Sequence, residues 1–297
     1  MKALLFARYG DPSVLEIADV PAPHPGPGQI RIAVRTAGVS PGDVALRSGA
    51  WRDRVALPLP YVIGVEAAGT VDEIGDGVEG VRPGDEVFGL RALGGATATF
   101  ALLDAWAAKP PTMTWVQAGG AAAAIETSVR ALDAVNTGPG TTLLVDGATG
   151  GVGTILVQLA VARGARVLGT AGPANHEFLA GLGAHPLTYG PGLPARVTER
   201  VDAAIDIAGH GSLPDLVTLT GTPSSVVTLV DPAAASLGVR LTRYDPAADH
   251  HAALARGAGV TVHVAAAYPW TAAAEAHTRV ATGHTRGKIV LTVGQPT

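Results

Sequence analysis

The chain has 297 residues, of which 47% are apolar, and its 21 Lys and Arg against 25 Asp and Glu give a net charge of -4. This length allows two domains, and the weakly acidic balance argues against nucleic acid as the main partner, because phosphate binding needs concentrated positive charge. The lack of cysteine excludes disulfides, thiolate catalysis and cysteine-ligated zinc. With no secretory signal and no membrane-spanning stretch, we expect a cytoplasmic protein without a membrane partner.

The first third of the chain has the pattern of β-structure. Short runs rich in β-branched residues at 1–7, 29–37 and 67–74 are bounded by Pro and Gly, which predicts strands. The segments 21–28 and 75–85 are rich in Pro and Gly and predict turns. A compact β domain follows from this density of turns.

The pattern changes near Thr114, a plausible N-cap for a helix over 114–135. From there, expected strands at 143–147, 165–172, 201–209 and 224–231 alternate with expected helices at 152–164 and 176–183. Such alternation predicts a parallel sheet with right-handed crossovers. The last forty residues return to mixed structure, with a helix over 271–282 and a strand over 288–293, and the pair His250-His251 lies in an expected loop.

A glycine turn joins the strand at 143–147 to the helix at 152–164. This context is typical of a dinucleotide site, because the turn lets the backbone approach a pyrophosphate and the helix N-terminus offers free N–H groups. Gly153 is expected to let the helix pack against the strand. The alternative is a tight turn without a ligand. The residues expected to hold the cofactor here are Gly147, Thr149, Gly150, Gly151, Val152 and Gly153.

The end of the second expected strand bears on the choice of cofactor. It reads Gly169-Thr170-Ala171-Gly172, without the acid that an NAD site usually places on the ribose 2′-hydroxyl. No Arg or Lys follows directly, and Ala171, Gly172, Asn175 and Tyr189 are expected to lie along the cofactor. Asn175 and His176 could equally start a helix. The pattern favours NADPH over NADH.

Four blocks in the right order resemble the zinc-independent quinone oxidoreductases of the medium-chain dehydrogenase/reductase superfamily. They are the opening residues 1–43, YVIGVEAAGTVDEIGDGVEGVRPGDEVFG, DGATGGVGTILVQLA and AAEAHTRVATGHTRGKIVLTV. The resemblance implies an α/β fold in which a GroES-like β domain (1–114 and 259–297) flanks a Rossmann domain with a parallel sheet (115–258), with the active site in the cleft between them. It also implies a homodimer that pairs through the Rossmann sheet edge, here SSVVTLV (224–230).

The metal ligands of the zinc branches are missing from this chain. Those branches place cysteine where this chain has Ser40 and histidine where it has Val65, and Glu66 alone cannot build a tetrahedral site. We therefore expect no metal and no zinc. Without a Lewis acid, reduction of a quinone or of an activated C=C fits better than alcohol oxidation.

The resemblance carries further residues to the cofactor. It implies that Thr127 lies by the nicotinamide carboxamide, that Tyr189 lies near the adenosine phosphate, and that Lys288 approaches from the C-terminal segment. For Lys288 the alternative is a solvated turn lysine. Residues that follow strand ends complete the expected set: Ala208, Thr228 and Val230.

Departures from the family pattern point to the reaction site. Ser40 stands where the family usually has Asn, and the block at 95–100 lacks the family's tyrosine. Glu126 replaces a hydrophobic residue, so it is either a proton donor or an exposed acid. With Ser40 and Glu126, Asp43 completes the candidate catalytic set. Trp51 and Tyr61 are the candidate substrate-binding residues, although plain packing explains Trp51 as well.

Two functions from different classes remain open. One is an NADPH-dependent reductase of a small-molecule quinone or enone, including a specialised reductase in a natural-product pathway. The other is a dinucleotide-binding or sensor protein without turnover on the same scaffold.

Overall fold

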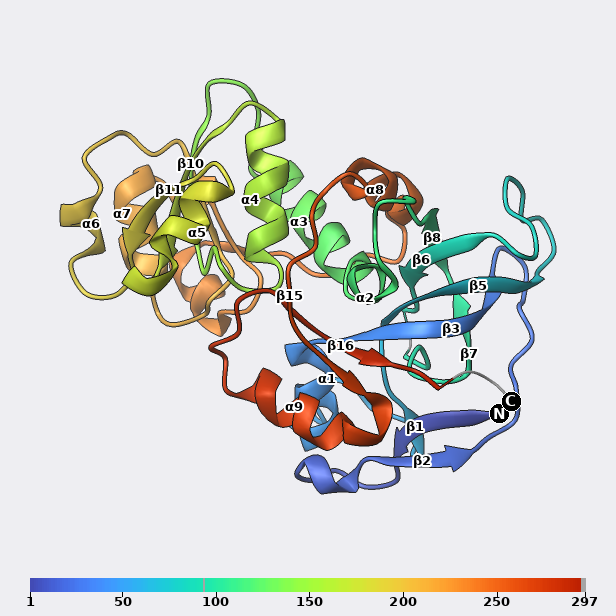
Figure 1. The fold of residues 1–297 in the computed structure, drawn as a ribbon. Coiled ribbons are helices and arrows are strands. Elements are labelled where there is room, and N and C mark those ends of the chain that lie inside the picture. Colours follow the sequence, from blue (N-terminus) through green and yellow to red (C-terminus); the bar gives the residue numbers. More distant parts are fainter. Residues whose placement is uncertain (93, 295–297) are drawn as a thin grey trace. The chain divides into compact units, whose positions relative to one another are not determined.

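The computed structural model describes residues 1–92 and 94–294. It divides into two compact units, Met1–Ala123 with Asp249–Thr297, and Ala124–Ala248 (Figure 1). The sequence had suggested boundaries at 114/115 and 258/259. The helices next to both boundaries belong to the first unit, since residues 115–119 and 250–257 pack on its strands.

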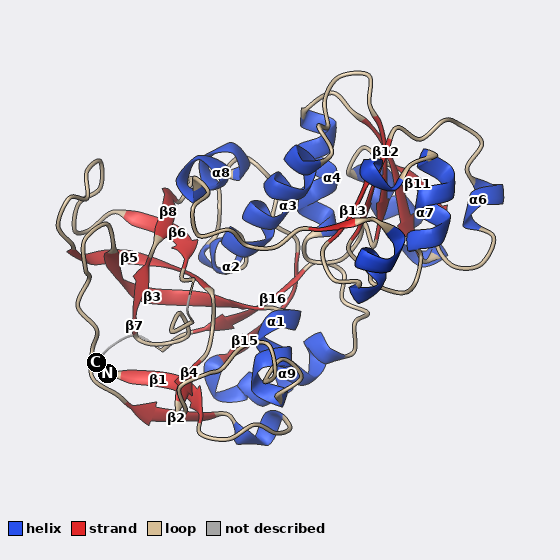
Figure 2. Cartoon of the chain, turned by 180° about the vertical axis from the view of Figure 1, so that it is seen from behind, coloured by secondary structure: helices blue, strands red, loops and turns tan. Residues whose placement is uncertain are grey.

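The first unit is mainly β-structure, in a seven-stranded sheet with the order β15-β16-β3-β5-β6-β8 and β7 paired to β3, and a three-stranded sheet with the order β2-β1-β4. Strands are drawn in red in Figure 2. Their bounds are β1 Lys2–Phe6, β2 Glu16–Asp19, β3 Ile30–Val39, β4 Tyr61–Val62, β5 Glu66–Ile74, β6 Glu86–Leu90, β7 Phe100–Leu103, β8 Ala105–Ala108, β15 Val264–Pro269 and β16 Lys288–Thr292. The helices are α1 Pro41–Ser48, α2 Trp115–Gly119, α8 His250–Gly257 and α9 Ala273–Ala281.

The long strand β3 organises the seven-stranded sheet. Its alternate residues Ile30, Ile32 and Val34 are fully buried in one apolar cluster, which is the period of two that a half-buried strand requires. β3 pairs with β5 on one side and with β16, from the far end of the sequence, on the other. The first unit is therefore built from both ends of the chain.

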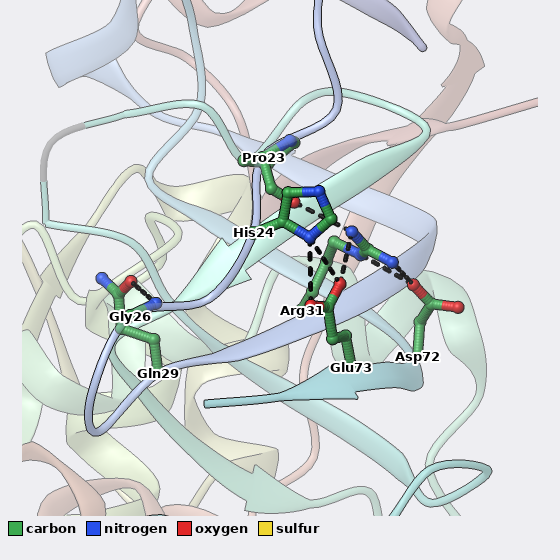
Figure 3. Close-up of polar contacts among 7 residues, drawn as sticks. All are labelled: Pro23, His24, Gly26, Gln29, Arg31, Asp72 and Glu73. Atoms are coloured by element: carbon green, nitrogen blue, oxygen red, sulfur yellow. Dashed lines mark hydrogen bonds and ion pairs between the residues drawn. The ribbon is translucent and has the colours of Figure 1, made fainter. Parts of the chain in front are cut away.

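A polar cluster fastens the loop before β3 to the sheet (Figure 3). Arg31 forms ion pairs with Asp72 and with Glu73, whose Oε2 is 2.6 Å from Nη1. The same guanidinium donates to the Pro23 carbonyl over 3.0 Å, and His24 Nδ1 lies 3.0 Å from Glu73 Oε1. These contacts hold Pro23 and His24, within the Pro- and Gly-rich segment 21–28, against β3 and β5.

The second unit is a six-stranded parallel sheet with helices, which confirms the expected Rossmann fold. Its strand order is β11-β10-β9-β12-β13-β14. The strands are β9 Thr142–Asp146, β10 Arg166–Ala171, β11 His185–Thr188, β12 Ala203–Asp206, β13 Val226–Thr228 and β14 Arg240–Leu241. The helices are α3 Ala122–Ala134, whose first two residues belong to the first unit, α4 Gly153–Ala162, α5 His176–Gly181, α6 Leu193–Arg196 and α7 Leu213–Thr220.

Three expectations need correction. The helix expected over 114–135 is two helices, α2 and α3, which end and begin at 119 and 122. The segment SSVVTLV is not the sheet edge, because β13 has β12 on one side and β14 on the other. His250 and His251 begin α8 rather than lie in a loop, since Asp249 caps this helix by accepting from the Ala252 N–H over 2.9 Å.

Within the described residues, no helix combines the length and the apolar character needed to cross a membrane.

Candidate functional site

The glycine turn of the second unit leaves β9 and enters α4. A Cβ on Gly153 would lie 2.3 Å from the Gly147 carbonyl oxygen and 2.6 Å from Ala148 C, so only glycine allows α4 to pack this closely. A Cβ on Gly150 would meet only the Gly147 oxygen, at 3.5 Å. The protein's own packing thus requires a glycine at 153 but not at 150.

The start of α4 lacks a side-chain cap. Val152 precedes the helix and makes no capping bond, and the N–H groups of Gly151, Val152 and Gly153 donate to no other described residue. Free N–H groups at a helix N-terminus favour an anion. An uncapped ten-residue helix beside an unfilled glycine position therefore fits a pyrophosphate.

Other expected cofactor residues lie beside this turn. A Cβ on Gly147 would be 3.2 Å from Ala208 N, which places residue 208 against the end of β9. One on Gly209 would be 2.6 Å from Val230 Cγ2, and Val230 itself is 52% exposed. Gly147 follows β9, Ala208 and Gly209 follow β12, and Val230 follows β13. These residues are far apart in the sequence but lie close together at the carboxyl ends of the three strands.

Buried acids at these strand ends were not among the expected site residues. Asp146 accepts from the Thr170 hydroxyl and, over 2.6 Å, from Ser212 Oγ. Asp206 accepts from Thr228 Oγ1 over 2.7 Å and from the Gly209 N–H over 2.8 Å. Burial raises the pKa of Asp206, and nearby Asp146 adds to the rise. The Thr228 hydroxyl therefore donates to Asp206 and links the end of β13 to the end of β12.

The end of β10 carries the expected adenosine side of the site. Thr188, the last residue of β11, lies in register with Ala171, the last residue of β10. Tyr189 follows directly, is 54% exposed, and its Cε1 would lie 3.8 Å from a Cβ on Gly172. Asn175 ends the short 3-10 helix Pro173–Asn175 and directly precedes α5, which begins at His176, and its side chain makes no capping bond to this helix.

Glu126 and Thr127 lie in α3 and share a partner. The Glu126 side chain is buried and accepts from Arg130 Nε over 2.9 Å, while Arg130 Nη2 is 3.4 Å from Thr127 Oγ1. Arg130 Nη1 also donates to Thr242 Oγ1 over 2.7 Å. Of the two interpretations left open for Glu126, the exposed acid does not apply, and the pairing compensates the cost of burying its charge.

In the first unit, Ser40 and Asp43 form a capping box at the start of α1. Ser40 Oγ donates to Asp43 Oδ2 over 2.6 Å, and the Ser40 N–H donates to the same oxygen over 2.8 Å. The Asp43 carboxyl is buried, and its Oδ1 has no partner among the described residues. Burial raises the pKa of Asp43 above its ordinary value, against the opposing effect of the two hydrogen bonds from Ser40.

Trp51 and Tyr61 lie near this pair. Trp51 Cη2 would be 3.6 Å, and Ser40 Oγ 3.4 Å, from a Cβ on Gly42, and Trp51 remains 39% exposed. Burial raises the pKa of the Tyr61 hydroxyl, and the Asp43 charge acts in the same direction. The structure therefore gathers Ser40, Asp43, Trp51 and Tyr61 in one part of the first unit.

Lys288 is neither exposed nor in a turn. It is the buried first residue of β16, and its Nζ lies 2.8 Å from Glu66 Oε1. Glu66 Oε2 accepts from the Ala123 N–H over 2.8 Å. Glu66 therefore joins β5, β16 and the first turn of α3. Sequence patterns could not reveal this pair, because 222 residues separate the two partners.

Among residues 1–92 and 94–294, no three His, Cys, Asp or Glu side chains come close enough together to hold a metal ion.

Comparison with known proteins places these features in a family. Residues 26–125 match the alcohol dehydrogenase GroES-like domain, and residues 182–291 match the zinc-binding dehydrogenase family. The quinone oxidoreductase of Rattus norvegicus is 37% identical over 183 residues, 60% of this chain and 55% of the rat protein. This alignment thus spans about half the length of that relative.

Two further relatives bear on the chemistry. The polyketide synthase GfsB of Streptomyces halstedii is 42% identical over 159 residues, 52% of this chain and 3% of that protein. The solved structure of mycobacterial Rv1454c complexed with NADPH is 30% identical, with a TM-score of 0.79, and the match covers 98% of this chain and 100% of that one. The chain belongs to the quinone oxidoreductase group of the medium-chain dehydrogenase/reductase superfamily.

Proposed function

We propose that the protein is an NADPH-dependent, metal-free oxidoreductase that reduces a quinone or the activated C=C of an α,β-unsaturated carbonyl. The observation that carries the proposal is the glycine turn, where Gly150 is free of packing demands and the N–H groups at the start of α4 are free. A dinucleotide pyrophosphate explains both features. A plain tight turn needs Gly153 but gives no reason for Gly150.

A bound nicotinamide would supply the hydride, and the chain's own residues would bind and orient the reactants. In this proposal the backbone at Gly150, Gly151 and Val152 holds the pyrophosphate. Thr127 is proposed to contact the nicotinamide carboxamide, and Ala208 and Val230 to line the cofactor.

Ser40 and Asp43 are the proposed groups for the substrate carbonyl. Ser40 Oγ is a hydroxyl with two acceptor sites and one donor, and Asp43 lies 2.6 Å from it. Glu126 is the weaker candidate for a proton donor, because Arg130 holds its carboxylate in an ion pair.

The donor set supports a reaction without zinc. At the positions where zinc branches are expected to have cysteine and histidine, Ser40 and Val65 offer no thiolate and no imidazole. Glu66, the remaining acid, is held by Lys288 and the Ala123 N–H. We expect the purified protein to contain no stoichiometric zinc by metal analysis, and chelators to leave its activity unchanged.

The partial match to a polyketide synthase supports a more specific form of this proposal, in which the substrate comes from a natural-product pathway. The expected homodimer would pair through β14, the outer strand of the six-stranded sheet beside β13.

The test of the proposal uses Gly150→Ala. Its Cβ would meet only ordinary contacts, so the free energy of unfolding should change by no more than about 0.5 kcal/mol. NADPH binding, followed by nicotinamide fluorescence, should weaken about tenfold or more, because the methyl group faces the pyrophosphate. Equal NADPH affinity in the variant and the native protein would contradict the assigned site.

A non-catalytic dinucleotide-binding protein is the second candidate, since Ser40 replaces the family's usual Asn. A panel of quinones, simple enones and polycyclic ketones separates the two, with NADPH oxidation as the readout. Turnover of any acceptor supports the reductase, whereas NADPH binding without oxidation of the whole panel supports the second candidate.

A further inference from the structure

The residues directly after β10 contain no positive charge that could bind a 2′-phosphate. In a Rossmann domain the residues after the second strand meet the ribose 2′ position, and a 2′-phosphate there needs a cation. The sequence directly after β10 supplies none, since residues 172–175 are Gly-Pro-Ala-Asn. A Cβ on Gly172 would have only Tyr189 within 4 Å, so space remains beside that ring.

An arginine from a later segment reaches the adjacent strand end. Arg196 closes the short helix α6, and its guanidinium donates to three carbonyl oxygens: Nε to Thr188 over 3.0 Å, Nη1 to Pro191 over 2.9 Å, and Nη2 to Gly190 over 2.7 Å. The carbonyls of Thr188 and Gly190 flank Tyr189. The guanidinium is thus fixed beside the tyrosine at the carboxyl end of β11.

The charge of Arg196 is not neutralised by these bonds. All three acceptors are neutral carbonyls, and no carboxylate in residues 1–92 or 94–294 pairs with this side chain. A guanidinium has five N–H donors, so three bonds leave it with donors to spare. Arg196 is partly exposed and held in a fixed position, and it keeps an unpaired charge and unused N–H donors. Such a side chain can bind an anion.

The register of the two strands sets the end of β11, where Arg196 is bound, beside the end of β10. Thr188 pairs with Ala171, and neighbouring strands lie about 4.8 Å apart. His176 Nε2 donates to the Ala171 carbonyl over 3.2 Å, so its imidazole lies next to the same strand end. The end of β10 and the end of β11 therefore lie side by side, with Tyr189 next to Gly172.

Resting on the proposed dinucleotide function, we infer that Arg196, held beside Tyr189 by three backbone carbonyls, is the residue that selects a 2′-phosphorylated dinucleotide over its unphosphorylated counterpart. The Tyr189 hydroxyl supplies a second contact to the phosphate. Arginine–phosphate bonds are charge-assisted and roughly twice as strong as neutral ones, so the selectivity follows mainly from Arg196.

The experiment isolates the 2′-phosphate. Calorimetry measures the affinities of the full-length protein for 2′,5′-ADP and for 5′-AMP, and fluorescence measures those for NADPH and NADH. In the native protein the phosphorylated member of each pair should bind more tightly. Arg196→Gln should lower both ratios about tenfold or more and leave 5′-AMP and NADH affinities unchanged. Arg196→Lys, which keeps the charge, should retain part of the preference.

Arg200→Gln is the matched control. Arg200 is four residues away, its side chain is 89% exposed, and it lies 3.3 Å from Asp202, so its loss should leave both ratios at the native value. If Arg196 only supported the turn, Arg196→Gln would lower the affinities for the phosphorylated and the unphosphorylated ligand by the same factor. That outcome overturns the inference.

Two other results overturn the inference about Arg196 but leave dinucleotide binding intact. One is an affinity ratio that Arg196→Gln does not change, and the other is a native protein that shows no preference for the phosphorylated ligands. A native protein that binds neither NADPH nor NADH would contradict the proposed function itself.

Discussion

At the scale of single residues, His277 shows how burial sets the pH range of stability. The side chain lies in α9, is 1% exposed, and its Nδ1 has no partner among the described residues. Burial, with help from the Arg47 charge, lowers the pKa of His277 to about 4. The folded protein therefore keeps this imidazole neutral at a pH where the unfolded chain has protonated it.

The sign of the effect follows from proton counting. Between about pH 6.5 and 4 the unfolded state binds one proton more, so stability is complete above this window and falls as the pH drops through it, by about 3 kcal/mol in total. His277→Leu should flatten the pH dependence of the urea midpoint in that window. His210→Leu, at an exposed position, should leave it unchanged. Equal pH profiles for native protein and His277→Leu would contradict this account.

The buried pair of Glu66 and Lys288 gives a second prediction at this scale. Lys288→Met leaves the Glu66 charge buried without its cation, which should lower the free energy of unfolding by about 3–5 kcal/mol. Adding Glu66→Gln removes the charge and should restore most of the loss. Denaturant unfolding measures both, and Lys2→Met, which breaks the exposed pair with Asp19, should cost no more than about 1 kcal/mol. A single variant as stable as the native protein would show that the pair contributes little.

At the scale of elements, the unit of β9, glycine turn and α4 depends on one close approach. In Gly153→Ala the new methyl group would meet backbone atoms at 2.3 and 2.6 Å, which cannot move independently. Thermal unfolding should show a loss of about 1–3 kcal/mol. Gly181→Ala in α5, where nothing lies within 4 Å, is the control and should be neutral or slightly stabilising. A Gly153→Ala protein of native stability would mean that α4 adjusts its position freely.

Elements that sequence could predict were those whose signal is local. The strands β1, β3, β5, β9 and β10 and the helices α4 and α9 follow from periodicity and flanking glycines, and Thr114 does cap α2. The break between α2 and α3 falls at Gly119 and Gly120, where the apolar spacing over 114–135 predicts a continuous helix. The folded chain packs closely there, since a Cβ on Gly119 would lie 2.5 Å from Thr36 Oγ1. The short strand β14 has only two residues, too few for any periodicity.

The candidate site shows the same division. The glycine turn was readable because all its parts are consecutive in the sequence. The contacts of Asp146 with Ser212 and of Glu66 with Lys288 join separate segments, so they appear only once the chain is folded. The contacts of Arg196 with the carbonyls around Tyr189 are local, but they depend on how the segment after β11 turns. Sequence named Lys288 and Tyr189 but not their partners.

At the scale of the whole molecule, the two units differ in how the chain builds them. The second unit is one continuous segment, whereas the first needs both ends. A chain that stops at Ala248 should lose the first unit, because β16 contributes the buried Ile289, Val290 and Leu291 beside β3. Hydrogen exchange should then be fast in β3 and β5 but remain slow in β9, β10 and β12. Fast exchange throughout the shortened chain would show that the second unit cannot fold alone.

The ion pair of Glu66 with Lys288 can form only late in synthesis, because its two partners are made far apart in time. The ribosome adds roughly 5–20 residues per second, so the 222 residues between the partners take roughly 10 to 45 s to make. During that interval β3 lacks its neighbour β16, and Glu66 lacks its cation. The segment 124–248 leaves the ribosome meanwhile and has all its own strands available. The nascent chain therefore exposes an unfinished β-sheet edge for tens of seconds, which is the period when a chaperone would matter most to its yield.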